Sequence, residues 1–243
     1  MAWILALLAV GVTTLWAWLM CQFERPLRAP WLALTVAFAW GALPSTLVSL
    51  GAQNILLDWA NAQFGREAVL LLYSTVFTGL IEELAKGGGM VLLFFWQREH
   101  FKTWRQGIVY GAVVGLGFAL FEHIKFLFEA PAEEQLSLFV RRVLLFGLSH
   151  AFYTGLIGIG LGLARSSSSR AVRSMAVIGG FAAAVVTHAL NNTALALTER
   201  TDGLSFLGVC GNYLLLAGLY VALYVSARRA PCAHRLDSGS VLT

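Results

Sequence analysis

Long apolar stretches, separated by short polar segments, repeat along almost the whole chain. A helix needs about 20 apolar residues to cross a bilayer, and seven stretches reach that length. The predicted spans are residues 2–22, 30–51, 67–97, 106–128, 139–164, 172–197 and 204–227. The pattern therefore predicts an all-α fold, a polytopic transmembrane bundle of about seven helices that forms one integral membrane domain over residues 1–243.

The third stretch, residues 67–97, is longer than one crossing needs. Such a helix must tilt, kink or project beyond the bilayer. Glycine weakens a helix because it has no side chain to restrict the backbone. We therefore expect Gly87, Gly88 and Gly89 to form a weak point in this helix.

The composition agrees with a membrane protein. Hydrophobic residues make up 58% of the chain and charged residues only 12%, whereas soluble domains carry about 25% charged residues. The net charge of +4 is explained by basic loops on one side of a membrane, so we expect no nucleic-acid partner. The three cysteines (Cys21, Cys210 and Cys232) are far apart and predict no disulfide framework.

Basic residues divide unequally between the loops on the two sides of the predicted bundle. One set of loops and the C-terminal tail hold Arg25, Arg28, Arg98, Lys102, Arg105, Arg165, Arg170, Arg173, Arg228, Arg229 and Arg235. The other set holds only Arg66, Arg141, Arg142 and Arg200. Because cytoplasmic loops carry the excess of Lys and Arg, we expect the N-terminus outside and the C-terminus in the cytoplasm.

Four predicted spans carry polar residues, although an ionisable group at the bilayer centre costs about 2.5–3.5 kcal/mol on insertion scales. These residues are Glu82, Glu83, Lys86, Glu122, His123, Lys125, His150, His188, Asn191 and Asn192. At about 1.5 Å of rise per residue, Glu82 and Glu122 lie about 22 and 24 Å from the cytoplasmic helix ends. His150 and His188 lie about 21 and 24 Å from theirs. We therefore expect one polar layer in the outer half of the bilayer, within a catalytic core at about residues 67–197.

Two interpretations of this layer compete. Buried polar contacts can hold helices together, at about 0.6 kcal/mol per contact. Alternatively, a carboxylate in a dry site can activate water as a general base or acid. Two histidines and a carboxylate can also hold a catalytic zinc with one open position, and Glu122, His150 and His188 are the candidate ligands. Since these residues lie on different helices, no local spacing confirms a metal.

The neighbours of these residues have simpler explanations. Lys86 lies one helical turn from both glutamates and is expected to neutralise one of them. Lys125 is expected to pair with Glu122 or to extend toward the membrane surface. His123 points about 100° away from Glu122 on the helix and is expected to be a packed histidine. Asn192 could orient His188, bind the substrate backbone or satisfy a helix contact.

Four sequence blocks together resemble the PrsW family of bacterial intramembrane proteases, within the wider group of CAAX-processing glutamate proteases. The blocks are IEELAKG at 81–87, GIVYGAVVGLGFALFEH at 107–123, SHAFYTGLIGIGLGLAR at 149–165 and HALNN at 188–192. The family pattern is EExxK, a GFxxxE helix, a histidine helix and HxxxN, in that order. One departure is His123, where the family pattern has asparagine after the glutamate.

The resemblance implies roles for particular residues. Glu82 and Glu83 match the catalytic glutamate pair, and the other matching positions are Lys86, Glu122, His150, His188 and Asn192. In the hypothesis that follows, one glutamate activates water and the other helps to bind or protonate. His150 and His188 polarise the scissile carbonyl, hold the water or ligate a metal with Glu122.

The resemblance also implies a substrate and a location. The expected activity is hydrolysis of a peptide bond in or near a membrane segment of a membrane-anchored protein, of which an anti-sigma factor is one example. The expected location is the bacterial inner membrane, and a zinc ion is the cofactor to test for. The alternatives are a non-catalytic multi-pass scaffold, whose polar layer only organises helix packing, and a transporter.

Overall fold

The computed structural model describes residues 1–24, 29–64 and 73–229, and every regular element in these ranges is helical. The elements in chain order are α1 (Ala2–Cys21), α2 (Trp31–Trp40), η1 (Gly41–Ser45), α3 (Thr46–Phe64), η2 (Tyr73–Phe77), α5 (Thr78–Trp96), α6 (Trp104–Glu129), α7 (Gln135–Phe139), η3 (Val140–Leu145), α8 (Ser149–Ser166), α9 (Arg170–Ala196), η4 (Glu199–Thr201) and α10 (Phe206–Arg229). Elements η1 to η3 are π-helical turns, and η4 is a 3₁₀ turn. The predicted all-α bundle is confirmed.

Six helical stretches in the described part of the chain are long and apolar enough to cross a membrane. They are Ala2–Cys21, Trp31–Gln63, Trp104–Glu129, Gln135–Ser166, Arg170–Ala196 and Phe206–Arg229. Helix α5 is the seventh long helix, and it carries Glu82, Glu83 and Lys86 in its buried face. The first part of its predicted span, residues 67–72, lies outside the described residues.

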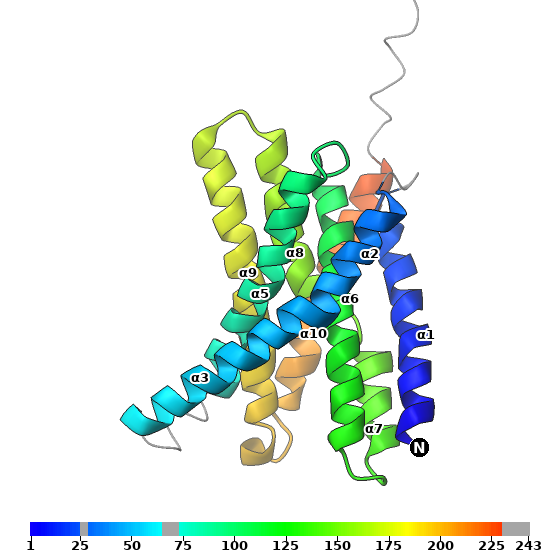
Figure 1. Cartoon of the computed structure of the whole chain (residues 1–243), viewed down its shortest axis with the longest axis vertical. Helices are drawn as coiled ribbons and strands as arrows, with labels where there is room; N and C mark the ends of the chain where they lie inside the picture. The colour runs from blue at the N-terminus through cyan, green and yellow to red at the C-terminus, as the bar shows by residue number, and fades with distance from the viewer. Residues whose placement is uncertain (25–28, 65–72, 230–243) are drawn as a thin grey trace, which may run out of the picture.

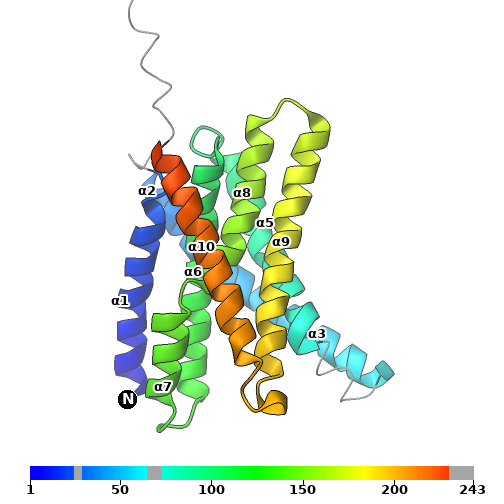
Figure 2. The same ribbon diagram turned by 180° about the vertical axis from the view of Figure 1, so that it is seen from behind.

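The second predicted span, residues 30–51, is shorter than the helix that forms. The helical stretch runs over Trp31–Gln63, because the polar residues after position 51 continue the helix rather than starting a loop. It includes Pro44 within the π turn η1, where a wider turn accommodates a residue that has no backbone N–H. In Figures 1 and 2, α2 and α3 cross the bundle obliquely, and the end of α3 projects away from it.

The fifth predicted span, residues 139–164, is interrupted in the middle. Element η3 ends at Leu145 and α8 begins at Ser149. The backbone N–H of Ser149 donates to the carbonyl oxygen of Phe146 over 3.0 Å, which closes the connection between them. Irregular backbone inside a membrane is tolerated where protein or a cavity surrounds it, and this break places His150 at the start of α8.

The expected weak point at Gly87, Gly88 and Gly89 is wrong, because α5 runs without interruption from Thr78 to Trp96. The glycines allow close packing instead. A Cβ added at Gly89 would collide with the ring of Trp40, and one at Gly88 would touch the same ring. The Trp40 Nε1–H also donates to the carbonyl oxygen of Ala85 over 3.1 Å.

Helices α6 and α8 form the centre of the bundle. Gly107 of α6 lies against Gly158 of α8 so closely that a Cβ on either residue would overlap the other residue's carbonyl group. Gly111 and Gly115 repeat this approach one and two turns further along α6, against the backbone of Thr154 and His150. Small residues spaced in this way let transmembrane helices pack backbone to backbone. The result is a seam that holds the start of α8 in place.

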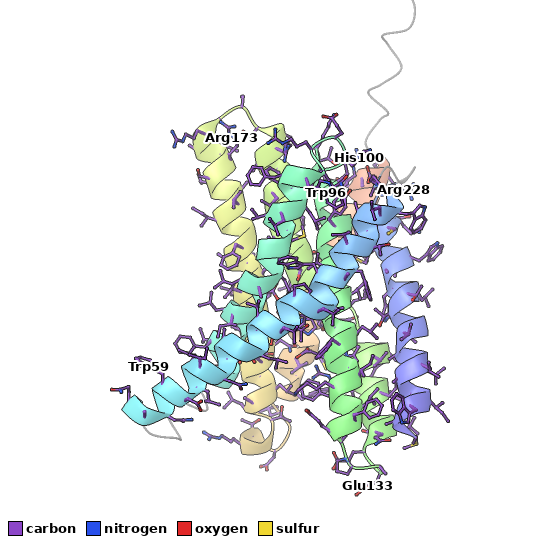
Figure 3. All side chains as sticks on the ribbon, viewed as in Figure 1. Trp59, Trp96, His100, Glu133, Arg173 and Arg228 are labelled. Carbon is purple, nitrogen blue, oxygen red and sulfur yellow. The ribbon has the colours of Figure 1, made fainter. Side chains whose placement is uncertain are left out.

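Charged residues gather at the two ends of the bundle as the loop pattern predicts. Arg173 and Arg228 lie at one end, and Glu133 lies at the opposite end (Figure 3). The N-terminus lies near the Glu133 end, whereas α10 finishes at the basic end (Figures 1 and 2). Which end faces the cytoplasm stays a prediction. The basic positions outside the described residues are Arg25, Arg28, Arg66 and Arg235.

Candidate active site

Four helices bring their polar residues together in one buried cluster. Helix α5 supplies Glu82 and Glu83, α6 supplies Glu122, α8 supplies His150 and α9 supplies His188. Glu83 is fully buried, and Glu82 is 4% exposed. The imidazole rings of His150 and His188 lie with their centroids 5.2 Å apart and nearly perpendicular. The structure thus joins the residues that the depth count placed in one layer.

Lys86 is the cation at the centre of the cluster, and its side chain is fully buried. Its Nζ lies 2.8 Å from Oε1 of Glu83 and 3.4 Å from Oε2 of Glu82. The third neighbour is Nδ1 of His150, at 3.1 Å. An ammonium group has three N–H donors, and these three neighbours provide one acceptor for each donor. Lys86 therefore contacts both glutamates, although its single positive charge can balance only one of them, and it also contacts a ring nitrogen of His150.

His188 contacts both glutamates through its two ring nitrogens. Its Nδ1 lies 2.9 Å from Oε1 of Glu83, and its Nε2 lies 3.7 Å from Oε2 of Glu82. The ring stacks on Tyr153 with centroids 4.7 Å apart. A carboxylate that accepts from Nδ1–H leaves the lone pair of Nε2 free. The free nitrogen of His188 then faces Glu82.

The two adjacent glutamates have different surroundings. Glu83 Oε2 accepts a hydrogen bond from the Thr154 hydroxyl over 3.2 Å, and Glu82 Oε1 accepts one from the Gln53 amide over 3.3 Å. Thr154 is fully buried on α8, whereas Gln53 is half-buried on α3. Among the described residues, Glu82 but not Glu83 lines a cavity of about 620 Å³. His150 and His188 line the same cavity.

Glu122 lies at the edge of the cluster and also lines the cavity. Its Oε2 is 2.9 Å from Nε2 of His150 and 3.2 Å from a terminal guanidinium nitrogen of Arg142. Glu122 therefore orients His150 from the side opposite Lys86. Lys125 does not pair with Glu122; its Nζ lies 3.1 Å from Oε2 of Glu129, near the exposed end of α6.

His123 and Asn192 lie further along the same cavity. His123 is 4% exposed, as expected for a packed histidine, but its buried Nδ1 has no hydrogen-bond partner among the described residues. Asn192 is half-buried on α9 and lines the cavity together with Asn191. Both asparagines therefore lie where a substrate backbone could reach them.

The cluster has the donors that a divalent metal needs. Ligand atoms of Glu82, His150 and His188 lie within 4.8 Å of one another, and all three residues are buried. One carboxylate and two imidazoles form a common ligand set of catalytic zinc. The carboxylate of Glu83 on His188 Nδ1 supplies the outer contact that usually orients a ligating histidine. These three residues therefore fit a metal. The candidate ligands from the sequence were Glu122, His150 and His188, and in the structure Glu82 takes the place of Glu122.

Sequence reasoning did not assign roles to several residues of this site. Gln53 lies beyond the predicted end of its span, Arg142 belongs to the predicted loop charges, and Thr154 occurs only within the sequence block at residues 149–165. Tyr153, which stacks on His188, gave no signal of its own. The position of Thr154 on the same face as His150, one turn along the helix, is the one signal that could have identified a partner for a glutamate.

Membrane-length helices here enclose carboxylates and imidazoles beside a cavity, as a membrane-embedded hydrolase requires. Over residues 29–227 the chain matches the family described as PrsW family intramembrane metalloprotease, and it belongs to that family. The protein is therefore a multi-pass membrane peptidase. Comparison with curated proteins and with solved structures gives no match.

Proposed function

We propose that this peptidase cleaves a peptide bond in or near a membrane segment of a membrane-anchored substrate, and that Glu82 activates the attacking water. The observation that carries this assignment is that Glu82, His150 and His188 meet in one buried group that lines the cavity. A water in that cavity reaches Glu82 without moving any helix. The anti-sigma factors suggested by the sequence resemblance are the first substrates to test.

Glu83 has a positioning role in this proposal. Its carboxylate contacts Lys86, His188 and Thr154, and these contacts use both of its oxygens. It holds His188 so that Nε2 faces Glu82, and it fixes the ammonium group between the two carboxylates. Removing Glu83 therefore disturbs both the geometry of the site and the packing of α5 against α8 and α9.

His150 and His188 polarise the scissile carbonyl and hold the water beside Glu82. When a divalent metal is bound, it lowers the pKa of its water and polarises the substrate carbonyl. Glu82, His150 and His188 would hold that metal, which requires Lys86 to leave Nδ1 of His150, and Glu83 and Glu122 would orient the two histidines. With the metal bound, Glu82 would act on the water as a ligand of the ion; without it, Glu82 is the base. The residues of this chain thus supply both the ligands and the groups that keep them in place.

The experiment compares Glu82→Gln with Glu83→Gln in purified protein reconstituted into liposomes with a membrane-anchored anti-sigma factor. Glutamine keeps the size of the side chain and removes its charge. We expect Glu82→Gln to lower kcat/KM by at least about 10³-fold while the melting temperature stays close to that of the wild type. Glu83→Gln is expected to lower both the activity and the melting temperature, because Lys86 and His188 lose a buried partner.

A Glu82→Gln enzyme that still cleaves would overturn the assignment. So would the reverse pattern, in which Glu82→Gln unfolds the protein and Glu83→Gln removes activity without any change in melting temperature. If the wild-type enzyme cleaves none of the membrane-anchored substrates tested, the proposed reaction itself fails.

Metal removal tests the ligand assignment separately. We expect purified protein to contain about one divalent metal ion per chain, measured by elemental mass spectrometry, and chelation to abolish cleavage until metal is restored. His188→Gln should lose most of the bound metal, whereas Arg200→Gln, a change outside the cavity, should retain it. Full cleavage by metal-free protein would contradict the ligand role of these residues.

A further inference from the structure

The cavity beyond the catalytic cluster is rich in nitrogen donors. Arg141 and Arg142 of η3, His123 of α6 and Asn191 of α9 all line it. None of these residues belongs to the group of Glu82, His150 and His188, which lines the same cavity. This donor-rich part of the cavity is called the arginine subsite below.

Two buried nitrogen atoms in the arginine subsite have no partner among the described residues. They are Nε of Arg142 and Nδ1 of His123. A buried polar atom without a hydrogen bond is costly, and native proteins rarely leave one unpaired. His123 is more than nine-tenths buried, and it lies on the cavity wall. These atoms have almost no exposed surface of their own, but their side chains line the cavity, so a small side-chain rotation would offer each nitrogen to a ligand with acceptor atoms.

The position of Arg142 is fixed by two neighbours on α6. One terminal nitrogen pairs with Glu122 at 3.2 Å, and the guanidinium lies over the Phe126 ring at 4.2 Å from its centroid. These contacts hold the guanidinium still and leave its Nε–H unpaired. A guanidinium presents donors in a planar fork that matches a carboxylate.

Arg141, the residue before Arg142, supplies a second positive charge. It is exposed, it lines the cavity, and it forms no ion pair with any residue that the structure describes. The start of α8 adds to the positive potential, because its first turn contains no acidic residue and no side chain caps it. Ser149 at this helix start also lines the cavity, and a helix N-terminus favours negative charge.

We propose that the arginine subsite binds a carboxylate side chain of the substrate, so that the enzyme prefers Asp or Glu close to the scissile bond. This inference rests on the proposed function, because the subsite and the catalytic group share one cavity. The preference comes from Arg141 and Arg142 together with the His123 ring. The phosphate of an anionic lipid has the same chemistry and is the competing occupant to test.

The test uses the full chain in liposomes of phosphatidylcholine with reporter substrates of one design. Each reporter has one transmembrane segment followed by a neutral stretch in which a single position is Glu, Gln or Lys, and that position is moved along the stretch. Cleavage is followed by mass spectrometry. At the best position we expect the wild type to cleave the Glu reporter about tenfold faster than the Gln reporter in kcat/KM.

The decisive variant is Arg141→Glu, which reverses the exposed charge of the subsite. We expect it to prefer the Lys reporter over the Glu reporter. The matched control is Arg200→Glu, which changes an exposed arginine outside the cavity and should keep the wild-type preference. His123→Phe is the second variant, and it should reduce the ratio of Glu to Gln cleavage because it removes the unpaired nitrogen.

The possible failures are distinguishable. If the wild type cleaves Glu and Gln reporters equally well at every position, the carboxylate subsite is refuted and the peptidase function stands. If no reporter is cleaved, the proposed function fails and the inference falls with it. If adding phosphatidylglycerol changes the cleavage of Glu and Gln reporters equally, and Arg141→Glu removes that effect, the occupant is a lipid phosphate and the substrate carboxylate is excluded.

Discussion

Helices α6 and α8 meet backbone to backbone, whereas α3 meets α5 at the edge of the bundle through longer side chains. In the α6–α8 seam, a Cβ added at Gly107, Gly111 or Gly115 would overlap the backbone of α8. On the α3 side, Leu47 and Ile55 point out of the bundle and are more than half exposed. Beside the site, α3 is packed less closely than the seam, since a Cβ added at Gly51 of α3 meets nothing within 4 Å.

The residues proposed for catalysis lie on both sides of this contrast. His150 starts α8 and is held by the seam, by Glu122 and by Lys86. On the α3 side, the Gln53 amide of the described residues donates to Glu82 Oε1 over 3.3 Å. In the proposed mechanism, a firmly held His150 would let a substrate enter beside Glu82 without disturbing the group that polarises the carbonyl. Three substitutions test this contrast.

The largest effect is expected from Gly115→Ala, which disrupts the seam. The added Cβ would overlap the carbonyl oxygen of His150, so the backbone of α8 must move. We expect a loss of about 1–3 kcal/mol in the free energy of unfolding and a fall of about 100-fold in kcat/KM. Chemical unfolding in detergent micelles and the liposome cleavage assay measure the two quantities.

The control for this change is Gly211→Ala, since a Cβ at Gly211 meets nothing within 4 Å. It should leave both quantities close to the wild type. Equal effects of the two substitutions would contradict the rigid seam.

A smaller effect is expected from Thr154→Val, which leaves the seam packed and removes one hydrogen bond. Valine has nearly the same shape as threonine, but it cannot donate to Glu83 Oε2. The buried oxygen loses a partner, so we expect a loss of about 1–3 kcal/mol in the free energy of unfolding. Activity should fall by only about tenfold because Glu82 keeps its position. Unchanged stability with lost activity would instead make Thr154 part of the reacting group.

The smallest effect is expected from Gln53→Leu on the α3 side. The substitution removes the amide that donates to Glu82 Oε1. Because Gln53 is half-buried at the edge of the bundle, the free energy of unfolding should change by less than about 0.5 kcal/mol. We expect kcat/KM to fall about fivefold, which corresponds to about 1 kcal/mol. A loss of stability as large as that of Thr154→Val would show that the α3 side is rigid as well.

Hydropathy and charge predicted the parts of the fold that depend on burial in a bilayer. The expected spans and the shared depth of Glu82, Glu122, His150 and His188 follow from helix rise alone, and the structure brings these four residues together. The pairing of Lys86 with the glutamates followed from its spacing along one helix. These predictions needed no knowledge of how the helices are arranged around one another.

The features that the sequence did not predict depend on contacts between elements. Gln53 appeared to lie in a loop because polar residues follow position 51, and its contact with Glu82 depends on the tilt of α3. The distinction between Glu82 and Glu83 depends on which of them faces the cavity. The ion pair of Arg142 with Glu122 joins η3 to α6, so it depends on how these two elements lie beside each other.

We expect the oblique course of α2 and α3 to make the enzyme sensitive to bilayer thickness. The stretch Trp31–Gln63 contains 33 residues, which corresponds to about 50 Å of helix, whereas the hydrocarbon layer is about 30 Å thick. A helix that is too long for its bilayer tilts further as lipid chains shorten and stands more upright as they lengthen. Since Gln53 lies on this helix and contacts Glu82, we expect acyl-chain length to act as a physical control on the carboxylate that lines the cavity.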